Sequence, residues 1–325
     1  MMKVGIVGIN EGNGHPYSYS SIFNGFNEDL IDTCPFEVIR KYLTETHKNS
    51  HILENARVTH IWTQDIETSR NIADFTYIPN VVADIDDLIN KVDAVIIARD
   101  DVENHWKLSK KFIERGIPVF IDKLLTPNFQ ELEELLVCRD KSGGKIMATS
   151  SSRFTPGIYR AEKLLNESED SVRYIHGISK VSWIRYANHL LDGICYLFGT
   201  EFESVQNTAK GDDKDIVHIE FKNGLDCILS IYKEIALPIS FTVYTNKQHY
   251  TIPFTDTSFA SYFFGFYNML NDFVSYVSTG KSALSFNDSV KISSLIIAAS
   301  DSKREGNRKI SFDEVLSSSI GKYIN

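Results

Sequence analysis

The chain has 325 residues, and with 42% hydrophobic and 12% aromatic residues it can fill the cores of about two domains of roughly 150 residues each. Its net charge of −9 and the lack of any basic run argue against a nucleic-acid partner, because phosphate backbones bind to basic surfaces. The apolar stretch at 4–9 is too short for a signal peptide or a membrane span, and the four cysteines are too scattered for a disulfide framework or a structural zinc site, so we expect a cytoplasmic protein with reduced thiols and no membrane partner.

Strand and helix patterns alternate through the first half of the chain. Apolar, β-branched runs predict strands at 3–7, 56–62, 94–98, 117–121 and 145–149, and helical patterns lie between them at 66–73, 85–90, 105–115 and 129–139. This alternation is typical of βαβ units, whose strands form a parallel sheet. We therefore predict a doubly wound parallel α/β domain over residues 1–149.

The pattern changes after Ser150-Ser-Ser-Arg153. A predicted helix at 156–166 is followed by strands with period-two alternation at 172–179, 215–221, 226–232, 239–244 and 249–252, and by amphipathic helices at 262–278 and 289–303. The Asn-Gly turn within 222–225 predicts a hairpin between two of these strands. Residues 150–325 are therefore predicted to form a second domain, of the α+β class, with a mainly antiparallel sheet.

A glycine-rich turn follows the first strand directly and leads into a helix. It contains Gly8, Asn10, Gly12, Asn13 and Gly14. In such an arrangement the backbone N–H groups and the helix N-terminus face a dinucleotide pyrophosphate. The glycines do not follow the spacing Gly-x-Gly-x-x-Gly, so the turn is either a cofactor cradle or an ordinary glycine-rich loop.

The end of the second strand bears on which nicotinamide dinucleotide would bind. An acidic residue at this point bonds the adenosine ribose hydroxyls in NAD-binding proteins. The sequence here is Thr63-Gln64-Asp65, in which Thr63 occupies the expected position and an acid follows two residues later. NAD and NADP therefore both remain open.

The segment 18–55 is longer than one crossover helix requires. It predicts an additional helical insertion around 27–43, beside the mouth of the cofactor site. Because long ordered insertions near a site are more often functional than idle, we expect this one to contact the substrate or the cofactor mouth.

A specific resemblance begins at the strand Asp93-Ala-Val-Ile-Ile-Ala98. With His105 and the segment from Gly116 to Asp122-Lys123-Leu124, it resembles the Gfo/Idh/MocA oxidoreductases, in which the corresponding later strand ends in Glu-Lys-Pro. Further landmarks are Arg153-Phe154 and the segments 188–199, 273–280 and 298–302, so the resemblance covers nearly the whole chain. The family's motif Asp-x-Gly-x-His-x-x-Asp is kept at His189 and Asp192, whereas Arg185 and Ala187 stand at its first two fixed positions.

The resemblance implies a Rossmann domain that carries NAD or NADP and a second domain that covers the nicotinamide. It implies reversible oxidation of a hydroxyl group on a sugar, cyclitol or nucleotide-sugar-like substrate, and a homodimer or homotetramer formed through the second sheet. A closer likeness to a subgroup with a long insertion suggests a role in surface-polysaccharide sugar biosynthesis. The alternative is a non-catalytic protein of the same fold that binds nucleotide or sugar, because the glycine turn, the proline after Lys123 and the Asp at position 185 are all altered.

Hydride transfer from a secondary alcohol requires a base for the hydroxyl proton and a cation that stabilises the forming alkoxide. We assign the cation to Lys123, at the carboxyl end of a parallel strand, and the base to His189, whose imidazole suits proton transfer near neutral pH. The alternatives are a solvated lysine at a strand end and a core histidine on an apolar helix.

Other residues are assigned to binding. Arg185 either clamps a substrate carboxylate or phosphate with its planar guanidinium or is a surface arginine. The acidic group at 100–105 has the composition of a metal site, but no second ligand set lies near it, so we predict no metal and place its carboxylates near ribose or substrate hydroxyls. The predicted substrate contacts are Arg153, Arg185, Tyr186 and Asp192, and the predicted cofactor contacts are Gly8, Asn10, Gly12, Asn13, Gly14, Thr63, Gln64, Arg99, Asp100, His105 and Asp122.

Overall fold

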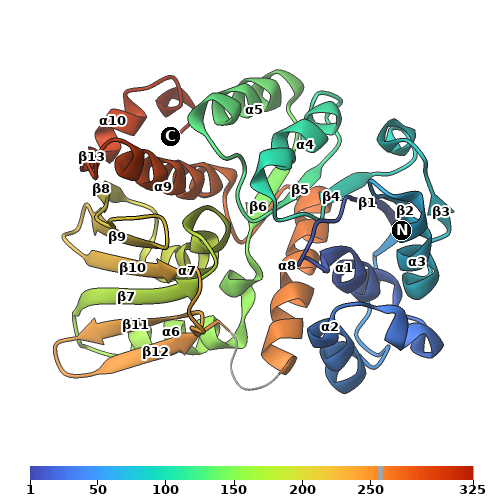
Figure 1. Ribbon diagram of the computed structural model, residues 1–325, viewed down its shortest axis with the longest axis horizontal. Helices are drawn as coiled ribbons and strands as arrows, with labels where there is room; N and C mark the ends of the chain where they lie inside the picture. Colours follow the sequence, from blue (N-terminus) through green and yellow to red (C-terminus); the bar gives the residue numbers. More distant parts are fainter. Residues whose placement is uncertain (255–258, 325) are drawn as a thin grey trace.

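In a computed structural model, which describes residues 1–254 and 259–324, six parallel strands form the sheet of the first domain. They are β1 (Met2–Val7), β2 (Ala56–Trp62), β3 (Asn80–Val81), β4 (Ala94–Ile97), β5 (Val119–Asp122) and β6 (Ile146–Thr149), and their order is β3-β2-β1-β4-β5-β6. This is the strand order of a doubly wound Rossmann sheet, which confirms the predicted fold class. Figure 1 shows this domain at the right of the molecule, with α4 and α5 above the sheet.

The helices of the first domain are α1 (His15–Asn24), α3 (Ile66–Thr76), α4 (His105–Ile113) and α5 (Phe129–Ser142). Helix α1 begins directly after the glycine-rich turn, where a helix was expected, and the other three match predicted helices within a few residues. The predicted helix at 85–90 is instead a single 3-10 turn, Ile85–Leu88, which Asp84 caps. The two-residue strand β3 was not predicted, because a segment so short carries no periodic pattern.

The second sheet has the order β12-β11-β7-β10-β9-β8-β13 within the described residues. Its strands are β7 (Val172–Lys180), β8 (Phe202–Asn207), β9 (Lys214–Phe221), β10 (Asp226–Tyr232), β11 (Ser240–Thr245), β12 (His249–Pro253) and β13 (Ile310–Ser311). Antiparallel pairs predominate, as predicted, but β7 and β10 pair in parallel. Strand β8 escaped prediction because an irregularity between Phe202 and Ser204 breaks its alternation.

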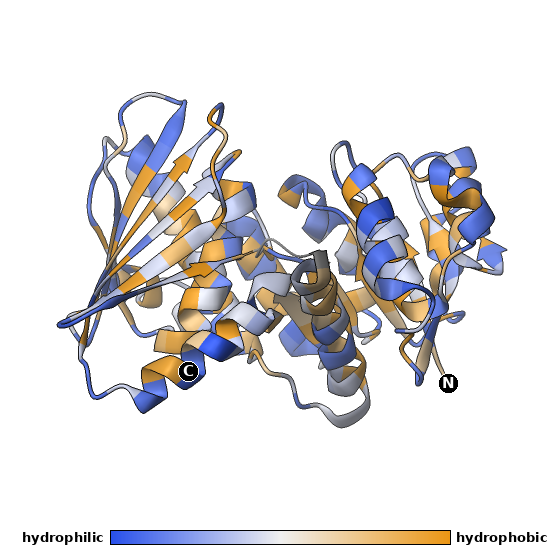
Figure 2. Cartoon of the chain, turned by 90° about the horizontal axis from the view of Figure 1, so that it is seen from below, coloured by the Kyte–Doolittle hydropathy of each residue, from blue (hydrophilic) through white to orange (hydrophobic). Residues whose placement is uncertain are grey.

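The second half of the chain also contains α6 (Pro156–Glu167), α7 (Trp183–Phe198), α8 (Phe259–Thr279), α9 (Phe286–Arg304) and α10 (Phe312–Leu316). Along β9 and β10 buried hydrophobic residues alternate with partly exposed ones, and Figure 2 shows the same alternation of hydrophobic and hydrophilic positions across the sheet. Among the described residues, none of the helices combines the length and the apolarity that crossing a bilayer demands.

Helix α8 returns from the second domain to the first. Its residues Phe263, Phe266 and Phe273 are buried in one core with Val4 and Phe120 of the first sheet. Figure 1 shows α8 beside α1, between the two sheets. The last strand of the first sheet ends at Thr149, and a helix from the later part of the sequence completes the first domain's core.

The predicted insertion is helical. It consists of a 3-10 segment at Glu28–Thr33, α2 (Glu37–Tyr42) and a π-helical turn at Leu43–His47. The ring of Tyr42 stacks on Tyr262 of α8 at a centroid distance of 6.3 Å. A Cβ atom at Gly14 would lie 2.4 Å from Ile39 and 2.5 Å from Phe36, so the insertion packs directly against the glycine-rich turn.

Candidate active site

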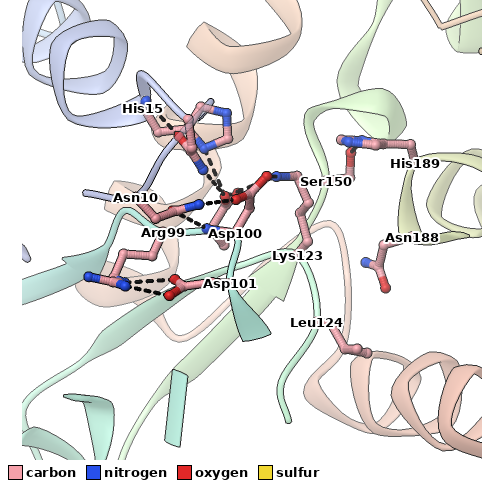
Figure 3. Close-up of polar contacts among 12 residues, drawn as sticks. Asn10, His15, Arg99, Asp100, Asp101, Lys123, Leu124, Ser150, Asn188 and His189 are labelled. Carbon is pink, nitrogen blue, oxygen red and sulfur yellow. Dashed lines mark hydrogen bonds and ion pairs between the residues drawn. The ribbon is translucent and has the colours of Figure 1, made fainter. Parts of the chain in front are cut away.

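The candidate site lies at the carboxyl ends of β1, β4, β5 and β6, where ligands bind in doubly wound sheets. The loops after these strands supply Asn10, Asp100, Lys123 and Ser150, and α7 supplies His189 from the second domain. Figure 3 shows the side chains of the first domain gathered on one side of Lys123, with Ser150 and His189 on the other. Groups predicted from distant parts of the sequence therefore meet in one place.

Lys123 is buried and pairs with two carboxylates. Its Nζ lies 3.1 Å from Asp122 Oδ2 and 3.6 Å from Asp100 Oδ2. Burial alone would lower the pKa of Lys123, but the two carboxylates outweigh burial and hold the pKa above its usual value. Lys123 also has a φ of +72°, in the left-handed region that non-glycine residues rarely occupy. The side chain is therefore a fixed ammonium group at neutral pH.

Asp122 is the centre of this charged group. Its Oδ2 lies 2.7 Å from His15 Nδ1, and its Oδ1 accepts a hydrogen bond of 3.2 Å from the Tyr19 hydroxyl. Burial tends to raise the pKa of Asp122, yet His15 and Lys123 together hold it below its usual range. Sequence reasoning missed both His15 and Tyr19. The two residues are four apart at the start of α1 and therefore lie on one helix face. This spacing is the feature of the sequence that could have indicated that they act together.

Asn10 and Asp100 join the glycine-rich turn to the loop after β4. Asn10 Nδ2 donates to Asp100 Oδ1 at 2.6 Å, and the backbone N–H of Asp100 donates to Asn10 Oδ1 at 3.0 Å. Asp100 also faces Lys123, which lowers the pKa of Asp100 against the opposing effect of burial. The turn, the β4 loop and the lysine thus form one connected polar network.

His189 faces this network from α7. Its Nδ1 lies 2.6 Å from Ser150 Oγ, and its ring packs against Tyr186 at 5.1 Å and Phe254 at 4.8 Å between centroids. Burial, assisted by the charge of Lys123, lowers the pKa of His189 to about 3. The imidazole is therefore neutral at pH 7.

Residues 38–150 match the family model described as the Gfo/Idh/MocA oxidoreductase family with an NAD-binding Rossmann fold. The match covers the larger part of the first domain and ends where its sheet ends. A curated relative, the uncharacterized oxidoreductase YhhX of Escherichia coli (strain K12), is 20% identical over 57% of this chain and 60% of its own, so the match spans less than two thirds of that protein.

Solved structures of other proteins share the fold over nearly the whole chain. Myo-inositol 2-dehydrogenase from Lactobacillus plantarum aligns with a TM-score of 0.73 and 13% identity, over 95% of this chain and 99% of that one. Myo-inositol dehydrogenase from Lactobacillus casei, in complex with NAD(H) and myo-inositol, aligns with a TM-score of 0.71 and 13% identity, over 96% of each chain. At such identities these structures establish the fold and no more.

The glycines of the glycine-rich turn have two different roles. A Cβ at Gly8 would lie 2.4 Å from Arg99 Cδ, so Gly8 lets the buried Arg99 side chain cross the turn and donate to the Ile9 carbonyl at 3.0 Å. A Cβ at Gly12 would meet no atom within 4 Å, and Gly12 is exposed. The turn is open at Gly12, where a pyrophosphate could approach the backbone, which fits the NAD(P) cofactor of an NAD-binding Rossmann fold.

At the end of β2, two of the predicted cofactor contacts are engaged within the protein. Thr63 is buried and donates to the Asp65 carbonyl at 2.6 Å. Gln64 bonds both the N–H and the carbonyl of Ile9 with its side-chain amide. The Asp65 carboxylate accepts from Thr68 as the cap of α3. Their direct contact with a dinucleotide stays a prediction, and so does the choice between NAD and NADP.

His105 and Asp192 are predicted ligand contacts that the structure places beneath the surface. His105 Nδ1 and Nε2 lie 2.5 Å and 2.9 Å from the carbonyl oxygens of Leu124 and Arg99, so the ring joins the loops around the lysine. Asp192 is fully buried and accepts hydrogen bonds from the Ser150 backbone N–H and from Thr149 Oγ1. Their burial argues against direct contact and favours a positioning role for both.

Arg153 is likewise 4% exposed, with its guanidinium over the Tyr196 ring at 5.5 Å. It lies near Asp192, whose pKa burial raises to about 6 although Arg153 opposes the rise. Arg185 and Tyr186, by contrast, are partly exposed and precede His189 by one helical turn or less. Of the predicted substrate contacts, these two are the ones that the structure leaves accessible.

Proposed function

We propose that the chain is an NAD(P)-dependent dehydrogenase or reductase that acts on a CH–OH group of a sugar, cyclitol or nucleotide-sugar-like substrate. The observation that carries this proposal is the fixed Lys123 ammonium at the carboxyl edge of the first sheet, with the neutral imidazole of His189 on the opposite side. The family-model match over residues 38–150 and the fold shared with inositol dehydrogenases support it.

In the oxidation direction, His189 accepts the hydroxyl proton at Nε2, because its Nδ1 is bonded to Ser150. Lys123 donates a hydrogen bond to the same oxygen and stabilises the alkoxide while the carbonyl forms. The bound nicotinamide would take the hydride from the carbinol carbon. Reduction is the reverse, in which His189 returns the proton to the oxygen.

The proposed assembly and location rest on separate observations. The face of the second sheet away from α6 and α7 carries partly exposed aromatic and aliphatic residues, among them Tyr174 stacked on Tyr244 at 5.6 Å. We propose that this face forms the homodimer or homotetramer interface, which sedimentation analysis would test.

The four cysteines are all unpaired, which supports a cytoplasmic location. A role in surface-polysaccharide sugar biosynthesis stays a prediction.

The test is a binding and turnover assay. Purified protein should bind NAD(H) or NADP(H), and a panel of cyclitols, sugars and nucleotide sugars should include a substrate that changes absorbance at the reduced-nicotinamide band. Binding of the cofactor without turnover of any panel member would favour the non-catalytic alternative. Binding of neither dinucleotide would contradict the proposal itself.

Arg185 bears on the charge of the substrate. It is partly buried and has no hydrogen-bond or ion-pair partner within residues 1–254 and 259–324. We propose that it binds a substrate carboxylate or phosphate. Arg185→Gln should then raise KM for uronic acids or sugar phosphates by about 10–100-fold and leave KM for neutral polyols unchanged. The rise corresponds to the loss of one charged hydrogen bond, which is worth about 1.5–3 kcal/mol. The control is Arg70→Gln, on the exposed face of α3. If Arg185→Gln left KM for uronic acids and sugar phosphates at the wild-type value, Arg185 would be a surface arginine.

A further inference from the structure

The partner of His189 is a serine that follows β6. Ser150 Oγ lies 2.6 Å from His189 Nδ1, and no other side chain of residues 1–254 and 259–324 hydrogen-bonds to the imidazole. The other close neighbours of the ring, Tyr186 and Phe254, contact it through their rings. The orientation of the imidazole therefore depends on one hydroxyl group.

The position of that hydroxyl is itself fixed. Ser150 caps the 3-10 turn Ser151–Phe154, and its Oγ accepts from the Ser152 N–H at 3.3 Å. Its own backbone N–H donates to Asp192 Oδ2, and Asp192 Oδ2 also accepts from Asn188 Nδ2 at 3.1 Å. Asp192 follows His189 by three residues on α7. The helix that presents the imidazole thus also holds the serine that orients it.

We propose that Ser150 is a positioning residue that keeps His189 in the tautomer with Nδ1 protonated, with Asp192 as the anchor of Ser150. This inference deepens the proposed function and rests on it where activity is concerned. It goes beyond the assignment of His189 as the base, because it states which nitrogen carries the proton and what determines this.

The hydrogen-bond capacity of a hydroxyl group is compatible with the assignment. A serine Oγ can accept two hydrogen bonds: Ser150 Oγ accepts one from the Ser152 N–H, and in the proposed tautomer it accepts the second from the imidazole Nδ1–H. With Nδ1 protonated, the lone pair of the neutral ring lies on Nε2, the nitrogen free to take a proton from the substrate. The imidazolium that results keeps the same bond in a charge-assisted and stronger form.

The first test is kinetic. Ser150→Ala should lower kcat by about 10-fold or more, since general-base catalysis as a whole is worth about 10²–10⁴-fold, and leave cofactor affinity unchanged. It should also move the acidic limb of the pH profile of kcat to lower pH, because the imidazolium loses its acceptor. Lys123, Asp122, His15 and Asp100, whose charges reach His189, stay in place in this variant.

Two variants separate orientation from stability. Ser150→Thr retains the hydroxyl and should recover most of kcat. Ser311→Ala removes a cap bond of the same kind, the 3.2 Å bond from the Asp313 N–H, at the start of α10 and should change neither kcat nor its pH profile. A folded Ser150→Ala protein with wild-type kcat and pH profile would overturn the proposal.

The second test does not require turnover. Nitrogen-15 NMR of the histidine side chains in the wild-type protein should show His189, assigned by its absence in His189→Gln, with the proton on Nδ1. A proton on Nε2 would overturn the inference even if Ser150→Ala failed to fold. If the wild-type protein showed no turnover, the proposed function would fail. The position of the proton on His189 would still confirm or contradict the inference about Ser150.

Discussion

His189→Ala should lower kcat by about 10²–10⁴-fold and leave NAD(P)(H) binding nearly unchanged, because a general base acts mainly in the transition state. That loss corresponds to roughly 3–5 kcal/mol of transition-state stabilisation. Lys123→Ala should be impaired to a similar degree, since the forming alkoxide loses its cation. Steady-state kinetics together with cofactor titration would measure both effects.

The double variant should lose less than the product of the two single effects, because both residues serve one proton-transfer step. The exposed residue Lys107 offers a matched alanine control outside the site, which should retain wild-type kcat. If His189→Ala kept near-full turnover and an unchanged pH profile, the histidine would be structural. Tyr186 would then be the better candidate for the base, because Asp192 is fully buried.

The sequence was most informative where local pattern and tertiary structure agree. The predicted bounds of β2 and β10 match the observed strands, because β2 is a compact run rich in apolar and β-branched residues and β10 alternates between buried and partly exposed positions. Lys123 and His189 were assigned through the resemblance, and the structure places them on opposite sides of one site. The residues that hold Lys123 and His189 in place could not be found through the resemblance.

Ser150 shows why. It lies in a run of three serines after β6, and its sequence neighbours give no reason to prefer it to Ser151 or Ser152. Its importance arises only when α7 brings Asp192 and His189 to the end of β6. Helix α8 was missed as part of the first domain for a related reason, since its aromatic face fits a core but does not say which core.

Asp122→Asn should reduce the free energy of unfolding by about 3–5 kcal/mol at pH 7, because it removes one partner of a buried charged group and leaves the others without their counter-charge. The ammonium of Lys123 would keep only Asp100, at 3.6 Å, and His15 would lose its 2.7 Å contact. Urea denaturation of the wild-type and variant proteins would measure the difference. Against a typical total stability of about 5–15 kcal/mol, the loss would be large.

The pH dependence of this difference has a definite sign. The pKa of Asp122 is depressed in the folded protein, so its stabilisation is complete above the unfolded pKa of about 3.9 and declines as the pH falls below that value. The gap between wild type and Asp122→Asn should therefore be widest near pH 7 and should narrow below about pH 4. Asp86→Asn is the control, because Asp86 pairs with Lys111 at the surface and should cost at most about 1 kcal/mol. Equal losses for the two variants would mean that the Asp122 network contributes no more than a surface ion pair.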